Sequence, residues 1–289
     1  MKIGVLGSIN SDIVYQIKTP PKQGETVFGD TYDILPGGKG ANQAVIAHSL
    51  GDEVAFLGSL GTDSFGQFSL QSFQSKGISI DNIAISSSPS GIAIIQLTQL
   101  DNSIVVIPGA NQSITLDHIN RYFEQHHDLS GVVTQHENNL DAVELFLRRA
   151  RNESIPTILN PAPANALSPD WQDFVDILIP NEHEARLIFK TTSLSKIVSL
   201  HPNRVVITLG DQGAMFHDGS REILVPAKKI NVVDTTGAGD SFVAGFSSSY
   251  FKDRNIITAI KQGIEVASIT CQYLGAQGAY DYLVHNLKK

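Results

Sequence analysis

The chain has 289 residues, of which 42% are hydrophobic and 17% charged, and its formal net charge is −8 at pH 7. The composition excludes a disordered chain, a fibre and a disulfide scaffold, and the length predicts one large domain or two small ones. The negative charge disfavours nucleic acid and anionic membranes as partners, so an anionic ligand requires a local binding site.

The apolar runs of the chain alternate with longer helical stretches. Apolar runs without polar alternation are typical of strands that are covered on both faces. The expected strands are residues 3–6, 54–57, 132–134, 157–159, 177–179 and 205–208. The expected helices are residues 42–50, 65–76, 116–123, 140–151, 182–189, 240–251 and 256–271. This alternation predicts an α/β fold with a doubly wound, mostly parallel sheet flanked by helices.

Two segments, residues 13–35 and 91–108, have an alternating, strand-like pattern instead. The second contains a hairpin-like turn at Leu100-Asp101-Asn102-Ser103. We expect the two segments to pair into a small β lid over the carboxyl ends of the main strands, where open α/β sheets bind ligands. The expected lid is residues 10–36 and 89–109, and the expected core is residues 1–9, 37–88 and 110–289.

Several sequence features favour a cytoplasmic location. Cys271 is the single cysteine, so no internal disulfide forms, and its surroundings predict a buried helix. The first residues contain no hydrophobic signal region, and no apolar run has the roughly 18 residues that a membrane helix needs. We therefore expect no export, no membrane span and a reducing environment.

A glycine cluster, Gly37-Gly38-Lys39-Gly40, leads into the first expected helix. Small residues at a helix entrance allow a ligand to approach the free backbone N–H groups. The cluster is not a nucleotide P-loop, because Gly rather than Ser or Thr follows the Gly-Lys pair. The alternative is a glycine-rich turn with no function, capped by Asn42.

A second cluster, residues 234–241 (DTTGAGDS), opens another expected helix. The amides of Gly237, Ala238 and Gly239 form a nest for negative charge, and Asp240 lies beside it. A base next to charge stabilisation is what phosphoryl transfer to a hydroxyl requires. The alternative is that Asp240 is a capping carboxylate, favoured by the helix dipole.

Three further motifs end expected strands. Asn10 and Asp12 are two residues apart, so in an extended chain both can grip a polyhydroxylated ligand, although an ordinary Asn/Asp turn is the alternative. Asn181 and Glu184 are one helical turn apart and can organise Mg²⁺ and its waters, or form an exposed capping turn. A β-turn fully explains the third motif, residues 207–213.

Six motifs together resemble the ribokinase-like (PfkB) family of carbohydrate kinases. In chain order they are GSINSD, PGGKGANQA, LNPAPA, PNEHE, TLGDQG and DTTGAGDSF. Each is weak or moderate alone, but their shared order and approximate spacing leave little room for coincidence. TGAGD marks the family, and GSINSD with GGKGANQA marks its ribokinase branch.

The resemblance implies a kinase that uses ATP and Mg²⁺ to phosphorylate D-ribose at the 5-hydroxyl, giving D-ribose 5-phosphate and ADP. It implies that Asp240 is the catalytic base and that Gly237, Ala238 and Gly239 form the anion hole. Positions that match sugar-binding residues are Asn10, Asp12, Gly38, Lys39, Asn42, Glu137 and Asp240. Positions that match ATP-binding residues are Asn181, Thr208, Gly210, Gly213 and Gly239, with Glu184 in the Mg²⁺ region.

The resemblance also implies an activating K⁺ beside the anion hole, which shapes the hole without touching the substrate. Its matching residues are Asp234, Thr236, Thr270, Tyr273 and Gly275. The resemblance also implies a homodimer in which the two lids pair with each other. Such pairing would cover the exposed strand edges of the lids.

This chain departs from the family pattern at three places. Residues 190–203 form a shortened segment, which can alter the adenine pocket, and Gly278-Ala279 replaces the usual Pro-Ser, which bears on K⁺ binding. His136 stands where an apolar residue is usual, and this bears on sugar specificity. Within the family the rival is a kinase for deoxyribose, adenosine, fructose or another sugar.

A different class remains as a second hypothesis, namely a sensor that binds a sugar without turnover. The retention of both Asp240 and the Gly-Ala-Gly anion hole argues against it, because binding alone needs no base.

Overall fold

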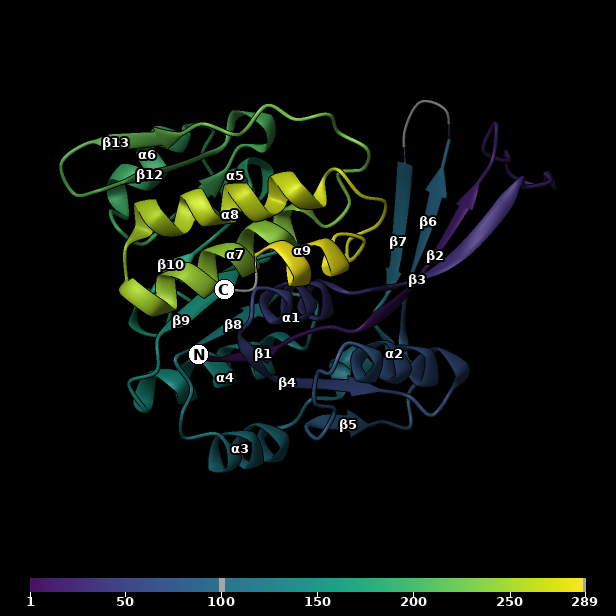
Figure 1. Ribbon diagram of the computed structural model, residues 1–289, viewed down its shortest axis with the longest axis horizontal. Coiled ribbons are helices and arrows are strands. Elements are labelled where there is room, and N and C mark those ends of the chain that lie inside the picture. Colours follow the sequence, from purple (N-terminus) through teal and green to yellow (C-terminus); the bar gives the residue numbers. More distant parts are fainter. Residues whose placement is uncertain (99–101, 288–289) are drawn as a thin grey trace.

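Six parallel strands form the central sheet of the computed structural model, which describes residues 1–98 and 102–287 (Figure 1). The strand order is β10-β9-β8-β1-β4-β5, and every neighbouring pair is parallel. The chain fills one half of the sheet after β1 and the other half from β8 onward, which confirms the doubly wound prediction. The strands are β1 (Lys2–Leu6), β4 (Glu53–Leu60), β5 (Ile83–Ile85), β8 (Gly131–Gln135), β9 (Thr157–Asn160) and β10 (Ile177–Leu178).

Helices cover both faces of this sheet, and the side chains of β1 alternate between two hydrophobic cores. Ile3 and Val5 pack in one core with α1, α7 and α8, whereas Leu6 packs in the other with α3 and α4. Burial on both faces explains why these strands lack polar alternation. The helices are α1 (Lys39–Ser49), α2 (Ser64–Ser75), α3 (Leu116–Gln125), α4 (Leu140–Asn152), α5 (Glu182–Phe189), α7 (Ala238–Asp253) and α8 (Ile256–Thr270).

Helices α1 and α7 begin two or three residues earlier than the sequence pattern predicts, and both begin inside a glycine cluster. Helix α1 starts at Lys39 after the N-cap Gly38, which has a φ of +91°. Helix α7 starts at Ala238 after the N-cap Gly237, which has a φ of +75°. Glycine adopts these angles without a steric penalty, so the turn and the first helical residues are one unit.

Several elements near the carboxyl-terminal half were not expected. They are α6 (Leu194–Leu200), α9 (Tyr280–Asn286) and a small antiparallel sheet of β11 (Ile207–Thr208), β12 (Ala214–His217) and β13 (Glu222–Val225). The strand expected at 205–208 is therefore shorter, and it meets the central sheet only through isolated parallel bridges such as Asn181 with Thr208. The glycine-bracketed turn reverses the chain, so β11 pairs with β12 instead.

The two segments with strand-like alternation form a separate four-stranded sheet, which projects beyond one edge of the layered core (Figure 1). Its order is β3-β2-β6-β7, with β2 and β6 parallel and the outer pairs antiparallel. The strands are β2 (Asn10–Gln16), β3 (Thr31–Gly37), β6 (Gly91–Leu97) and β7 (Asn102–Ile107). The first two residues of the expected Leu100–Ser103 turn lie outside the described residues.

Within residues 1–98 and 102–287, no helix combines the length and the apolar character needed to cross a lipid bilayer.

Candidate active site

Two adjoining cavities lie at the carboxyl ends of the central strands, and Lys39, Gly237 and Asp240 line both of them. The larger, of about 670 Å³, extends under the small sheet, and side chains of β6 and β7 such as Ile95 and Ile104 form part of its wall. This is the point where the strand order reverses between β1 and β8, which is where doubly wound sheets bind ligands. The cavities therefore occupy the position that the topology favours.

A close backbone approach fixes the start of α1 beside β1. A Cβ atom on Gly40 would lie 2.3 Å from the Cα of Gly7, and one on Gly37 would lie 2.2 Å from the Asp12 carboxylate. Only glycine fits at the backbone contact of Gly40, whereas a side chain at Gly37 would displace the Asp12 carboxylate. The glycine cluster thus brings the first turn of α1 against the end of β1 and against the carboxylate of Asp12.

The residues predicted to bind a sugar converge on the larger cavity. Its lining includes the predicted residues Asn10, Asp12, Gly38, Lys39, Asn42, Glu137 and Asp240. Glu137 Oε2 accepts hydrogen bonds from Ser8 Oγ at 2.6 Å and from the Lys39 backbone N–H at 3.1 Å. Asn10 Oδ1 accepts a hydrogen bond from Asn111 Nδ2 at 2.8 Å. Ser8 and Asn111, which hold these side chains, were not predicted.

The charged groups in this cavity shift one another's pKa values. Burial, together with the nearby Glu137 and Asp240 carboxylates, raises the pKa of Asp12 to about 7, although Lys39 opposes this shift. The Asp240 carboxylate raises the pKa of Lys39 against the opposing effect of burial. Three carboxylates around one ammonium make a site that favours hydrogen-bond donors such as hydroxyl groups.

His136 also lines the larger cavity, and its side chain is buried. Burial lowers the pKa of its imidazole to about 4, so the ring is neutral at physiological pH. A neutral ring adds no charge to the three carboxylates and Lys39.

Asp240 is buried near the start of α7, and amide groups of α1 hold both of its oxygens. Asn42 Nδ2 donates to Oδ2 at 2.9 Å, and Gln43 Nε2 donates to Oδ1 at 3.2 Å. The N-cap of α1 is Gly38 and no side chain caps this helix, so the expected cap at Asn42 is wrong. Asp240 is not the cap of its own helix, because Gly237 is the N-cap and has no side-chain cap bond, but Asp240 does lie in the first turn of α7, where the helix dipole favours a carboxylate.

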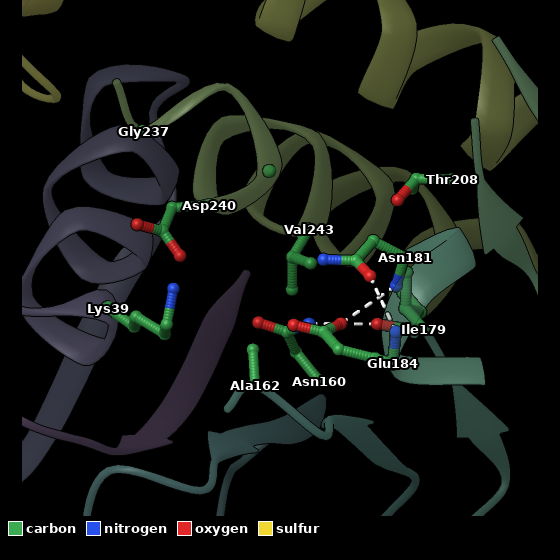
Figure 2. Close-up of a pocket in the computed structure, with 11 residues that line it drawn as sticks. Lys39, Asn160, Ala162, Ile179, Asn181, Glu184, Thr208, Gly237, Asp240 and Val243 are labelled. Carbon is green, nitrogen blue, oxygen red and sulfur yellow. Dashed lines mark hydrogen bonds between the residues drawn. The ribbon is translucent and has the colours of Figure 1, made fainter. Parts of the chain in front are cut away.

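The smaller cavity, of about 120 Å³, lies beside the start of α7. Figure 2 shows Lys39 and Asp240 on one side of it and Asn181 and Glu184 on the other. Asn181 and Glu184 form a reciprocal capping box on α5, as the structural alternative stated. Glu184 is nevertheless buried, and burial raises its pKa. Its carboxylate and the start of α7 suit a phosphate group that brings a hard cation.

A third cavity, of about 830 Å³, continues from the start of α7 toward α8. The predicted residues Thr208, Gly210, Gly213 and Gly239 line it, and Asn181 lies instead in the smaller cavity. Its mostly apolar wall was not predicted, because most of its apolar residues lie outside the motifs. Among them are Val232, Phe242, Ile264, Ala267 and Cys271. An apolar slot next to an anion site has the form that a nucleotide base and its phosphates require.

The residues predicted to bind K⁺ are brought partly together. Asp234 accepts hydrogen bonds from the Thr236 backbone and hydroxyl and from the Gly275 N–H at 2.8 Å. Burial alone would raise the pKa of Asp234, but these hydrogen bonds outweigh it, and the pKa is lowered overall. Thr270 Oγ1 donates to Ser241 Oγ at 2.8 Å, and no hydrogen bond of the described residues joins the Tyr273 side chain to Asp234. The carbonyl and hydroxyl oxygens of this loop are donors of the type that a hard monovalent ion accepts.

No group of three or more His, Cys, Asp or Glu residues with metal-site geometry occurs in the described part of the chain. A carboxylate-only metal cage is thus not among the described residues. Mg²⁺ bound through one or two carboxylates and the phosphates of a nucleotide is compatible with Glu184.

Comparisons with known proteins agree with this geometry. Residues 2–281 match the model of the pfkB family carbohydrate kinases, and the chain belongs to this family. It is 38% identical to a ribokinase of Lactococcus lactis over 96% of this chain and 93% of that protein. It is 39% identical to a ribokinase of Bacillus subtilis over 96% of this chain and 94% of that protein.

Similarity extends to the solved structures. A structure of Arabidopsis thaliana ribokinase complexed with ribose and ATP has a TM-score of 0.86 and 28% identity, and the match covers 99% of this chain and 98% of that one. The predicted resemblance and the predicted fold class are therefore confirmed.

Proposed function

We propose that this protein is an ATP-dependent kinase that phosphorylates D-ribose at the 5-hydroxyl, giving D-ribose 5-phosphate and ADP. The observation that carries the proposal is the position of Asp240. Its carboxylate lies where the larger cavity, the smaller cavity and the start of α7 meet. The similarity to ribokinases over nearly the whole chain supports ribose as the substrate.

The sugar binds in the larger cavity with its hydroxyl groups donating to carboxylates. Asp12 and Glu137 present acceptors, while Lys39 and the Asn42 amide supply donors. The 5-hydroxyl then points to Asp240, which accepts its proton as the oxygen attacks phosphorus. The amides of Gly237, Ala238 and Gly239 stabilise the charge on the transferred phosphoryl group.

ATP occupies the third cavity, with its base against the apolar wall and its γ-phosphate at the smaller cavity. Glu184 and Asn181 are the residues that hold Mg²⁺ and its waters beside the phosphates, and bound Mg²⁺ neutralises phosphate charge. Lys39 points into the smaller cavity and adds positive charge near the reacting phosphoryl group (Figure 2). The K⁺ proposal rests on the loop that Asp234 closes with Gly275, next to the anion hole.

A homodimer formed through the small sheet is part of the proposal. Tyr32 is 69% exposed on β3, and Val105 and Ile107 are 59% and 47% exposed on β7. β3 and β7 are the two edge strands of that sheet. Exposed apolar edges need a cover in a stable protein, and a second copy of the same sheet supplies one. Light scattering at micromolar concentration tests this, and a monomer contradicts it.

The assay that tests the activity is ADP release from ATP-Mg²⁺ with D-ribose, 2-deoxyribose, fructose and adenosine, each with and without K⁺. Turnover fastest on ribose supports the proposal. Faster turnover on another compound retains the mechanism and rejects ribose as the substrate. Ribose binding without ADP release supports the sensor hypothesis. We also propose a cytoplasmic location, where ATP and reduced thiols are available.

A further inference from the structure

We propose that Gln43 is a positioning residue for the catalytic base, and that a chain of buried amides fixes the direction of its hydrogen bond to Asp240. The inference rests on the proposed kinase activity. It concerns Gln43, Gln135 and Asn160, which are all buried and none of which belongs to the predicted sugar, nucleotide or cation residues.

The chain of amides begins at a group that can only accept. Asn160 Nδ2 donates to the backbone carbonyl of Ile179 at 2.8 Å. Because a carbonyl oxygen never donates, the amide of Asn160 has one possible orientation, with Oδ1 facing away from Ile179. That oxygen accepts a hydrogen bond from Gln43 Nε2 at 3.2 Å. The carbonyl of Ile179 thereby selects the orientation of the Gln43 amide.

A second contact uses the remaining polar atom of the Gln43 amide. Gln135 Nε2 donates to Gln43 Oε1 at 2.6 Å. Oε1 of Gln43 therefore faces Gln135, and Nε2 faces Asn160 and Asp240. If the Gln43 amide turned over, two oxygens would face each other at Asn160 and at Asp240, whereas the Gln135 amide, whose Oε1 has no partner in the described part of the chain, could turn with it. Turning the Gln43 amide thus costs two hydrogen bonds in a buried site.

The result at Asp240 is directional. Both N–H groups of Gln43 are used, one on Asn160 Oδ1 and one on Asp240 Oδ1. Asn42 donates to the other oxygen of Asp240, and Gln277 Nε2 donates to Asn42 Oδ1 at 3.0 Å. Each carboxylate oxygen of Asp240 therefore accepts one hydrogen bond from the protein, and the remaining lone pairs are available for a proton from the substrate.

Asp240 is therefore held both in place and in its role as an acceptor. A carboxylate that accepts two amide hydrogen bonds cannot rotate without losing them, and reaction rates depend strongly on such placement. The arrangement predicts that Gln43 acts on the chemical step and leaves sugar binding nearly unchanged. Gln135 acts on the same step only through Gln43.

The test uses the full chain with leucine at Gln43, at Gln135 and at both positions, in the ribose and ATP assay. The wild-type protein is measured first, and its failure to turn over any sugar rejects the proposed function itself. Once turnover of the wild-type protein has been measured, we expect Gln43→Leu to lower kcat by about 10–100-fold, which is the usual effect of a lost hydrogen bond to a charged group. We expect the KM for ribose to change by less than about threefold.

Gln135→Leu should lower kcat by a smaller factor, and adding it to Gln43→Leu should lower kcat no further. Exposed Gln125, at the end of α3, gives the matched control, and Gln125→Leu should leave all kinetic constants unchanged. If Gln43→Leu fails to fold, Gln135→Leu alone is the test, and a lowered kcat with a nearly unchanged KM for ribose supports the proposal. A kcat within twofold of wild type in the folded variants, or independent multiplication of the two effects, overturns the proposal.

Discussion

Two carboxylates of the larger cavity, the buried Asp240 and the partly exposed Asp12, have opposite surroundings. Asp240 accepts a hydrogen bond on each oxygen from amides of α1. No donor in the described part of the chain bonds to Asp12, and burial near Glu137 and Asp240 raises its pKa. Asp240 is thus held by the protein before any ligand arrives, whereas Asp12 is not. This contrast is what the proposed division of roles requires, with chemistry at Asp240 and sugar recognition at Asp12.

Among the tests of this contrast, replacing Asp240 should have the largest effect on activity. Asp240→Asn keeps the shape of the side chain but removes its capacity to accept a proton. We expect kcat to fall by about 10²–10⁴-fold, the usual contribution of a positioned base, with ribose affinity nearly intact. Steady-state kinetics and calorimetric titration with ribose measure both quantities. Near-full activity in this variant refutes the role given to Asp240.

Replacing the recognition carboxylate should give the reverse pattern. Asp12→Ala removes acceptors for sugar hydroxyls, and we expect the KM for ribose to rise by about 10–100-fold. The kcat at saturating ribose should stay within about threefold, because Asp240 and its amides are unchanged. An unchanged KM for ribose shows that the sugar site is misplaced.

The pKa of Asp12 predicts a pH dependence of sugar binding. In the ligand-free protein the carboxyl group is largely neutral below about pH 7 and ionised above it. Sugar hydroxyls donate to the ionised form, so the KM for ribose should fall several-fold between pH 6 and pH 8. Asp12→Asn should remove this dependence. His136 does not contribute over this range, because its pKa is lowered to about 4.

The smallest expected effect concerns stability. The folded-state pKa of Asp12 lies above its ordinary value, so the folded protein holds this proton more tightly than the unfolded chain does. The stabilisation from that proton is present at low pH and is lost as the pH rises through about 7. Asp12→Asn should therefore raise the ligand-free Tm by roughly 2–4 °C at pH 8, which corresponds to about 1 kcal/mol. Calorimetry should find a smaller gain at pH 5, and an equal gain at both pH values contradicts the explanation.

Most of the central fold and the motif residues were predictable from the sequence, for a local reason. Apolar runs report burial on two faces, and the glycine clusters report turns and helix starts, as Gly38 and Gly237 illustrate. The short helix α6 was missed, although Ser193 is a typical cap, because seven residues give little periodicity. Helix α9 has no side-chain cap at all.

The residues that support Asp240 could not be predicted in the same way. Gln43 lies in α1, Gln135 ends β8 and Asn160 ends β9, so only the folded chain brings them together. A buried glutamine in a helix or strand has no local signature. The apolar nucleotide wall was missed for the same reason, because Val232 and Ile264 belong to separate segments.

The contact between Gln277 and Asn42 has a consequence for protein synthesis. Asn42 lies in the first fifth of these 289 residues, whereas Asp240 and Gln277 lie in the last fifth. A ribosome that has made the first two hundred residues has therefore made only part of the wall of the larger cavity, without Asp240, the proposed base. Chains that emerge from the ribosome amino terminus first can begin to fold early. Under the proposed mechanism such a chain transfers no phosphate from ATP until this last segment docks on α1, so the order of synthesis would itself prevent activity in unfinished molecules.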